Sequence, residues 1–209
     1  MPSLTRSTAT IFASPSLRGS VEANRDKEYD SVRSFTTTCQ AMSLTATDFR
    51  KAMSTFATGV TIITVDQEGE IHGMTANAFT SVSLDPPLVL VCVDHRARTH
   101  AHLHARKRFG VNVLCSNQQA ISEYYAQSAE THQHPEKVGA RFDRTAHGTP
   151  VLHGALAYLE CRLYSTQPAG DHTIFIAEVE DVEVREGEPL LYFRSDYRGS
   201  GRTKVRGQE

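Results

Sequence analysis

The sequence predicts a mainly β protein, a small antiparallel barrel with a few short helices. Segments with strand patterns dominate the chain, and strands and helices do not alternate as a parallel sheet requires. Residues 173–185 alternate apolar and polar side chains with one break, which indicates a β-bulge of the kind that bends a closing barrel. Neither GxGxxG nor GxxxxGKS/T occurs, so no Rossmann or P-loop nucleotide site is encoded.

The composition is typical of one compact domain. The chain has 209 residues, 39% of them hydrophobic, and its formal net charge of -2 supplies no basic field for nucleic acid or membranes. No apolar run approaches the roughly 20 residues that a membrane span needs. The four cysteines are Cys39, Cys92, Cys115 and Cys161. They form no CxxC pair, which favours reduced thiols over a disulfide or a metal site. We therefore expect a cytoplasmic protein that binds neither nucleic acid nor membranes.

Residues 1–42 differ from the rest of the chain. They are rich in Ser, Thr, Arg and Ala and show no periodicity, which predicts a disordered N-terminal extension. The first part is basic, hydroxylated and free of acids, a composition that transit peptides share. An upstream start codon, with Met42 as the true first residue, explains the segment equally simply. One ordered domain is expected over residues 43–199, followed by a flexible tail, residues 200–209.

A helix is predicted at the start of the domain. Thr45 or Thr47 can cap it, and Gly59 lies just past its expected end. Its apolar residues recur at i, i+3, i+4 and i+7, which predicts one apolar face: Phe49, Ala52, Met53 and Phe56.

The remaining elements follow from apolar runs and turn residues. The turn DQEG separates the first two strands, and Asp85-Pro86-Pro87 must form a turn or lie at an edge. Short helices are expected at residues 99–108 and 117–130, the second opened by Asn117. Strands are expected at residues 60–65, 70–77, 79–84, 88–93, 109–115, 155–166, 173–185 and 190–193.

The stretch from Gly73 to Ser83 joins small and hydroxylated residues. Small side chains let a flat ring approach the backbone, whose N–H groups can bond ring atoms. The Asn77 amide and nearby hydroxyls can bond a polyol or a phosphate. A solvent-facing strand rich in Thr and Ser explains the same pattern without a ligand.

Two further segments carry polar groups beside predicted strands. Arg96, Arg98 and Thr99 precede a short helix, and a basic loop at a helix N-terminus can hold a phosphate, although solvated arginines are ordinary. In Gly170-Asp171-His172-Thr173, the glycine can direct the imidazole across the barrel mouth, where it could bond a nicotinamide carboxamide. A turn with a capping Asp and an exposed His is the simpler interpretation.

Taken together and in order, three segments resemble the flavin reductase component of two-component flavin-dependent monooxygenases. They are GMTANAFTSVSLDPPLVLVCVD, RTHAHLHARKRFGVNVL and GDHTIFIAEVEDVEVREGEPLLYF. The resemblance covers residues 44–198. It implies a split β-barrel of the Greek-key, FMN-binding type, which forms a homodimer with flavin near the subunit interface.

The resemblance also implies contacts along the flavin: Thr75, Ala76 and Asn77 at the isoalloxazine and ribityl chain, Ser81, Val82 and Ser83 toward the phosphate, and Arg98 and Thr99 closing on it. The implied contacts to the nicotinamide nucleotide are Asp171, His172, Tyr197 and Arg198, with His172 as the catalytic candidate. Where similar proteins often carry small residues, this chain has His95-Arg96-Ala97. That departure leaves the phosphate contacts, and FMN against FAD, open.

The implied activity is hydride transfer from C4 of NADH or NADPH to N5 of FMN or FAD. The reduced flavin then serves a separate oxygenase. One rival is an oxidase of the pyridoxamine-phosphate-oxidase-like barrel type, which needs no NADH; another is a flavin-binding module without turnover.

The histidines at positions 100, 102 and 104 raise a metal alternative. On a helix His100 and His104 share a face while His102 points away, and no carboxylate or Cys partner is evident nearby. We therefore predict no metal site.

Overall fold

The computed structural model describes residues 44–128, 132 and 134–199. The predicted extension, residues 1–42, and the predicted tail, residues 200–209, lie outside the described residues, as does Cys39.

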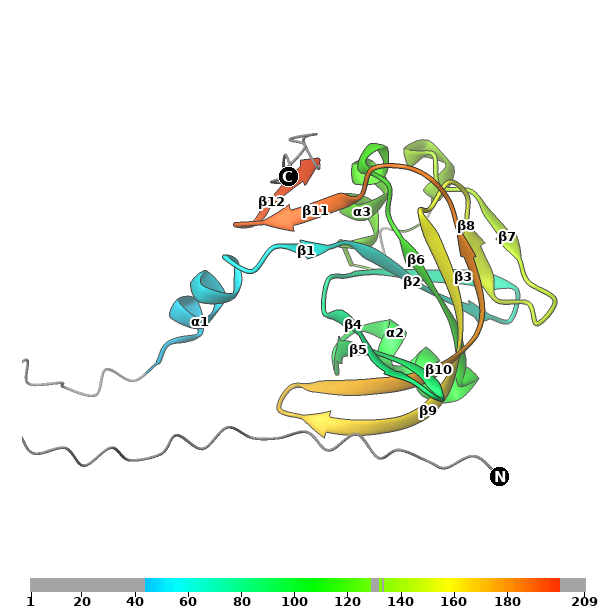
Figure 1. Ribbon diagram of the computed structural model, residues 1–209, viewed down its shortest axis with the longest axis horizontal. Helices are drawn as coiled ribbons and strands as arrows, with labels where there is room; N and C mark the ends of the chain where they lie inside the picture. The colour runs from blue at the N-terminus through cyan, green and yellow to red at the C-terminus, as the bar shows by residue number, and fades with distance from the viewer. Residues whose placement is uncertain (1–43, 129–131, 133, 200–209) are drawn as a thin grey trace, which may run out of the picture. The chain divides into compact units, whose positions relative to one another are not determined.

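One antiparallel sheet of seven strands forms the barrel wall and confirms the predicted fold class (Figure 1). Its spatial order is β3-β2-β6-β9-β10-β5-β4. The strands are β2 (Thr61–Gln67), β3 (Glu70–Ala76), β4 (Phe79–Leu84), β5 (Pro87–Asp94), β6 (Arg108–Val113), β9 (Ala157–Ala169) and β10 (His172–Val184). Asp85 and Pro86 form the turn between β4 and β5, as the Pro pair predicts.

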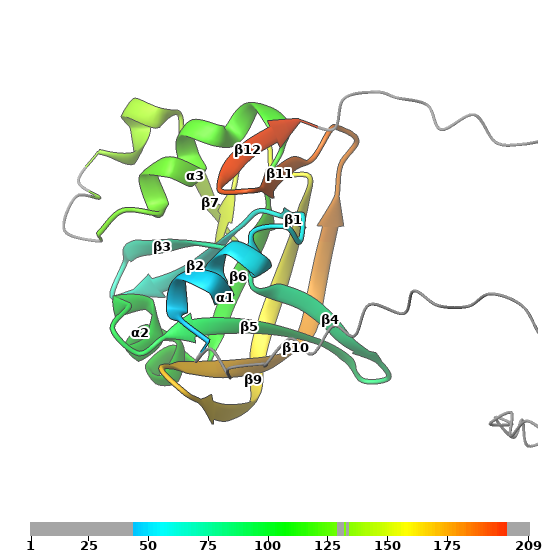
Figure 2. The same ribbon diagram turned by 90° about the vertical axis from the view of Figure 1, so that its left-hand side faces the viewer.

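The long β9–β10 hairpin bends at irregular positions of its ladder. The register between the two strands shifts between Ile176 and Ala177 and again between Val179 and Asp181. These shifts lie after Ile176, where the period-2 pattern breaks, which confirms the bulge expected from sequence. The hairpin curves across the barrel in both views (Figures 1 and 2).

Two small sheets complete the strands of the described residues. β1 (Thr58–Gly59), β11 (Leu190–Phe193) and β12 (Asp196–Gly199) form one, and β7 (Phe142–Arg144) pairs with β8 (Pro150–Leu152) in the other. β1, β7, β8 and β12 are too short to give a periodic pattern, and sequence analysis missed them. Gly59 belongs to β1, where it pairs with Leu191, so its predicted role just past a helix end is wrong.

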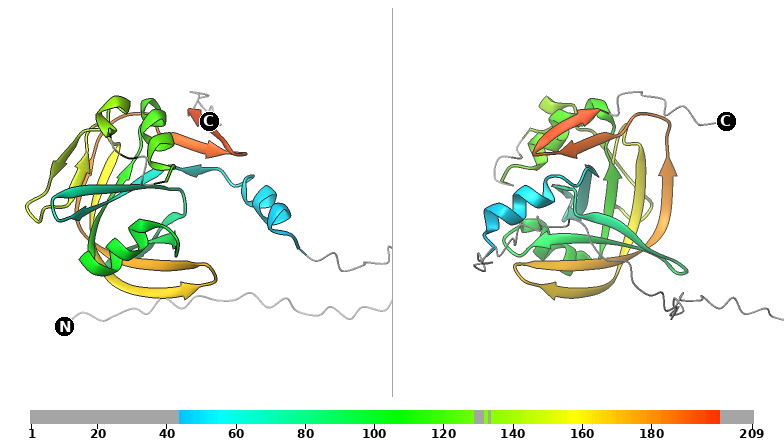
Figure 3. Two further views of the ribbon diagram at one scale, coloured as in Figure 1. Left: turned by 180° about the vertical axis from the view of Figure 1, so that it is seen from behind. Right: turned by 60° about the vertical axis from the view of Figure 1, so that its left-hand side comes forward.

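The first helix, α1 (Ala46–Met53), forms as predicted. Thr45 caps it: its Oγ1 accepts from the Asp48 backbone N–H at 3.1 Å, and Asp48 bonds back to Thr45. No residue of α1 is buried in this chain; Phe49 is 56% exposed and Phe56, beyond the helix, 68%. The helix extends away from the barrel (Figure 3), which leaves its apolar face open.

Two further α-helices pack on the barrel. α2 (Arg98–Arg106) lies against the sheet through Leu103, which is fully buried. α3 (Gln119–Tyr125) is shorter than predicted, and a 3-10 turn, Ser116–Gln118, precedes it. The prediction that Asn117 opens this helix is wrong, because Asn117 lies inside that turn and the Gln118 side chain accepts from the Cys115 N–H. Another 3-10 turn spans Pro135–Val138.

The core has two parts. Ile63, Val65, Phe109 and Phe175 centre the larger one, under α2. Ile62, Leu114, Leu152 and Leu190 centre the smaller one, which also buries Tyr125 of α3. In the described part of the chain, no helix is long and apolar enough to cross a membrane. The three cysteines of that part are free: Cys92, Cys115 and Cys161.

Candidate functional site

Residues of β3 and of the segment that follows it line two neighbouring cavities. Thr75 and Asn77 line one of about 210 Å³, with Tyr192 and Tyr197 of the β11–β12 hairpin. Gly73 and Met74 line another of about 250 Å³. Because these residues are near neighbours on one strand, the cavities run along it, and we call them together the β3 groove. Side chains alternate along a strand, and Ala76 faces the core, where it is 8% exposed.

Hydrogen bonds tie the walls of the first cavity together. Thr75 Oγ1 donates to the Ser122 carbonyl at 2.6 Å, and Ser122 Oγ lies 2.9 Å from Tyr197 Oη. Three elements distant in sequence, β3, α3 and β12, thus meet at one short polar chain. This fixes Tyr197, expected at the nicotinamide nucleotide, beside Thr75 and Asn77, expected at the flavin.

The second cavity is basic and lies at the start of α2. Arg98 and Thr99 line it, and the preceding Ala97 offers no side-chain cap to the helix. The first N–H groups of a helix and its dipole favour an anion there. His132 lines the cavity and His102 does not; the Nε2 atoms of both are buried and have no partner within the described residues. Arg98 and the free N–H groups of the helix start suit a phosphate.

The same histidines are held neutral. The pKa of His102 is lowered below its ordinary value, mainly by burial and to a smaller extent by the charge of Arg98. Burial also lowers the pKa of His132, which lines the cavity. At neutral pH the fixed charges of the cavity are therefore its arginines, Arg96 and Arg98.

The turn Gly170-Asp171-His172, called the GDH turn below, lies beside the loop of residues 95–97, and the His95 N–H donates to the Asp171 carbonyl. His172 opens β10 opposite Asp94 of β5, and its Nδ1 is 2.7 Å from Asp171 Oδ1. Asp94 in turn accepts from the Arg96 backbone at 2.8 Å and from its side chain at 2.7 Å. These hydrogen bonds hold the pKa of Asp94 well below its usual range. The unexpected His95-Arg96-Ala97 sequence is thus the link between the GDH turn and the second cavity.

Not every predicted site residue meets at the groove. The structure brings together Thr75, Asn77, Tyr197, Arg98 and Thr99 in its walls, with Asp171 and His172 beside them. Ser81, Val82 and Ser83 lie on the edge strand β4 and line neither cavity, and Arg198 pairs with Asp196 at 2.9 Å. Their roles, and the backbone contact expected of Ala76, stay predictions.

The contribution of α3 to the groove was not predicted from the sequence. Tyr125 lines the second cavity, and Ser122 holds Tyr197 in the first. The only signal was Gly73: small residues at a ligand wall also mark places where another side chain comes close. Nothing in the sequence pairs residue 73 with residue 125.

The histidines of α2 do not converge on a metal site. No group of three or more His, Cys, Asp or Glu in the described part of the chain could hold an ion. The His100 and His104 rings lie 4.8 Å apart on one face, while His102 stacks on His72 at 4.3 Å. This is the arrangement expected of a helix.

Known proteins resemble this chain over most of its described length. A family model for flavin reductase-like domains matches residues 53–201. The NADH-dependent flavin reductase of a Rhodococcus species is 40% identical over 158 residues, which make up 74% of this chain and 86% of that protein. The reductase component of 4-hydroxyphenylacetate 3-monooxygenase from Thermus thermophilus is 40% identical over 151 residues, 72% of this chain and 93% of that one.

A solved structure agrees with these relatives. The styrene monooxygenase flavin reductase of Pseudomonas putida has a TM-score of 0.67 and 40% identity, covering 74% of this chain and 97% of that one. The fold, the family model and the relatives agree with one another, and the chain therefore belongs to the family of flavin reductase-like domains.

Proposed function

We propose that this protein uses NADH or NADPH to reduce FMN or FAD and delivers the reduced flavin to a separate oxygenase. The observation that carries the proposal is the β3 groove, in which a cavity walled by Thr75, Asn77 and Tyr197 adjoins a basic helix start. Relatives named as NADH-dependent flavin reductases and as monooxygenase reductase components support it.

The residues of the groove fit a flavin nucleotide. Arg98 and the uncapped N–H groups of α2 supply donors for a phosphate. Asn77 and the neighbouring hydroxyls supply hydrogen bonds for a ring and a polyol. When flavin and nicotinamide are both bound, they supply the hydride chemistry themselves.

The task left to the chain is to align two rings and exclude competing reactions. His172, anchored by Asp171, would orient the nicotinamide, while Tyr197 and Arg198 would hold the rest of its nucleotide. No side-chain nucleophile is required, and His172 orients rather than donating an obligatory proton.

We also propose a homodimer. The apolar face of α1 is exposed in the single chain, and Phe49, Met53 and Phe56 line a cavity of about 280 Å³ with Asn77 and Tyr192 of the first cavity. A second copy that covers this face would bury it and close the β3 groove from outside. Sedimentation velocity tests this: Phe49→Ser with Met53→Ser should dissociate the dimer, whereas a monomeric wild type would contradict it.

The function is tested by steady-state consumption of NADH and of NADPH with added FMN or FAD. Consumption that depends on flavin supports a reductase. Flavin binding without consumption of either nucleotide would instead support a binding module, and amine-dependent oxygen uptake would support the oxidase. The cytoplasmic location expected from composition stays a prediction.

A further inference from the structure

Thr173 follows the catalytic candidate His172 in β10 and points to the opposite side of the strand. Its side chain is buried, with the residue 5% exposed, whereas His172 remains 41% exposed. The Thr173 hydroxyl therefore faces the interior, between β5 and α2, while the neighbouring imidazole faces outward.

Two histidines share this one hydroxyl. Thr173 Oγ1 lies 3.1 Å from Nε2 of His95 and 2.9 Å from Nε2 of His100. Within the described residues it has no other partner. A hydroxyl has one proton and two acceptor lone pairs, so it can donate to at most one of the two imidazoles. At least one of the two Nε2 atoms therefore carries a proton and donates to Thr173 Oγ1.

The two histidines belong to the elements that carry the phosphate-binding candidates. His95 lies in the loop that continues through Arg96 and Ala97, and its backbone N–H donates to the Asp171 carbonyl at 3.0 Å. His100 lies in the first turn of α2, next to Thr99. Edge contacts hold the rings: His95 and His100 are 5.1 Å apart, and His100 lies 5.4 Å from Phe175.

We propose that Thr173 is a positioning residue, which fixes the start of α2 and the loop before it relative to His172. The proposal rests on the proposed function, because it joins the flavin side of the site to the nicotinamide side.

The test compares Thr173→Val, which keeps the shape and removes the hydroxyl, with Thr173→Ser, which keeps the hydroxyl. The matched control is Thr64→Val. Thr64 is also fully buried, and its hydroxyl bonds the Pro150 carbonyl at 2.7 Å. Thr64 lines neither cavity of the β3 groove. Both Val variants lose a buried hydroxyl, and only one of them should disturb the site.

We expect Thr173→Val to raise the KM for NADH and the flavin Kd, one or both by about tenfold, with a smaller effect on kcat. Thr173→Ser should stay within about twofold of wild type, and so should Thr64→Val even if its melting temperature falls. Equal effects of the two Val variants, or failure of Ser to restore both constants, would overturn the proposal.

A second readout does not depend on activity. Long-range ¹H–¹⁵N spectra report the tautomer of each imidazole, and wild type should show a protonated Nε2 in at least one of His95 and His100. Thr173→Val should change at least one of them. An unprotonated Nε2 in both rings of wild type would overturn the proposal. A protonated Nε2 in a protein that consumes neither NADH nor NADPH would overturn the proposed function alone.

Discussion

The ring of Tyr125 covers Gly73 so closely that a Cβ atom at position 73 would lie 2.6 Å from two ring carbons. The contact joins α3 to β3 in the wall of the second cavity. It explains why the groove needs glycine at this point: any side chain there would displace Tyr125 or bend the strand.

Gly73→Ala should therefore damage both stability and flavin binding. Overpacking of this kind costs about 1–3 kcal/mol in the free energy of unfolding. Displacement of Tyr125 should also raise the flavin Kd severalfold, as measured by fluorescence titration. Gly59→Ala is the control, because a Cβ there meets nothing within 4 Å; equal losses in the two variants would show that the Tyr125 contact is not the cause.

Tyr197→Phe should weaken nucleotide binding in the first cavity, because it removes the hydrogen bond to Ser122. Ser122 is fully buried, and the loss of such a partner costs on the order of 1 kcal/mol. That corresponds to about a fivefold increase in the KM for NADH if Tyr197 holds the nucleotide. Tyr192→Phe is the matched control, since Tyr192 lines the same cavity. If both Phe variants keep the wild-type KM, the assigned role of Tyr197 is wrong.

His172→Ala should separate nicotinamide use from flavin binding. With the imidazole gone, Asp171 loses the hydrogen bond that chiefly lowers the pKa of its carboxyl. We expect the KM for NADH to rise by about tenfold or more while the flavin Kd stays within about twofold. Arg98→Gln should show the reverse pattern. An unchanged KM for NADH in His172→Ala would refute the assignment.

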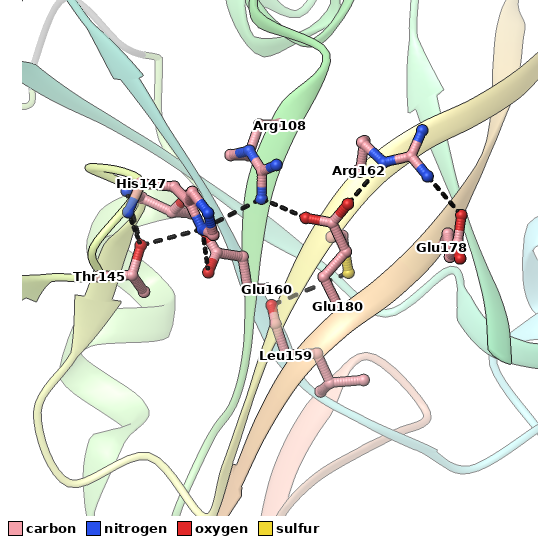
Figure 4. Close-up of polar contacts among 10 residues, drawn as sticks. Arg108, Thr145, His147, Leu159, Glu160, Arg162, Glu178 and Glu180 are labelled. Atoms are coloured by element: carbon pink, nitrogen blue, oxygen red, sulfur yellow. Dashed lines mark hydrogen bonds and ion pairs between the residues drawn. The ribbon is translucent and has the colours of Figure 1, made fainter.

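A buried carboxylate far from the groove should govern part of the acid stability. Glu160 accepts from Thr149 Oγ1 at 2.5 Å and from Thr145 Oγ1 at 2.9 Å, and it contacts His147 and Arg108 (Figure 4). Burial alone would raise the pKa of Glu160, but the hydrogen bonds donated to it outweigh burial and lower its pKa below the ordinary value of a glutamate.

A carboxylate with a lowered folded-state pKa stabilises the fold above its unfolded-state pKa, and this stability is lost as the pH falls through the folded-state value. Wild type should thus lose stability below about pH 4.5. Glu160→Gln should be less stable at pH 7 and show a flatter profile in urea unfolding between pH 7 and 3. Glu123→Gln, on the exposed surface of α3, should follow wild type; a Glu160→Gln profile parallel to wild type would contradict this account.

Local patterns predicted the barrel because each long strand has its own apolar run or its own alternation of apolar and polar residues. The runs around Ile63, Val91 and Phe109 became β2, β5 and β6, and the broken alternation after Ile176 became a bulge. The face of α1 shows the limit of such patterns. Periodicity shows that Phe49 and Met53 lie on one face, but not whether the same chain covers that face.

The site was less predictable than the fold, because its walls come from segments far apart in sequence. Thr75, Arg98 and His172 were singled out from motifs, and the structure places all three in or beside the β3 groove. Tyr125 and Ser122 belong to a helix with no motif, and only the packing of α3 on β3 reveals them. The pairing of His95 with His100 through Thr173 likewise requires β5, α2 and β10 to meet.

Anaerobic bleaching of flavin at 450 nm tests the central claim most directly. A catalytic amount of the protein is mixed with an excess of FMN or FAD and of NADH or NADPH. Oxygen is removed so that reduced flavin accumulates. The account predicts many turnovers of flavin per protein molecule with at least one nucleotide. Flavin that binds but keeps its 450 nm absorbance with both nucleotides would contradict it.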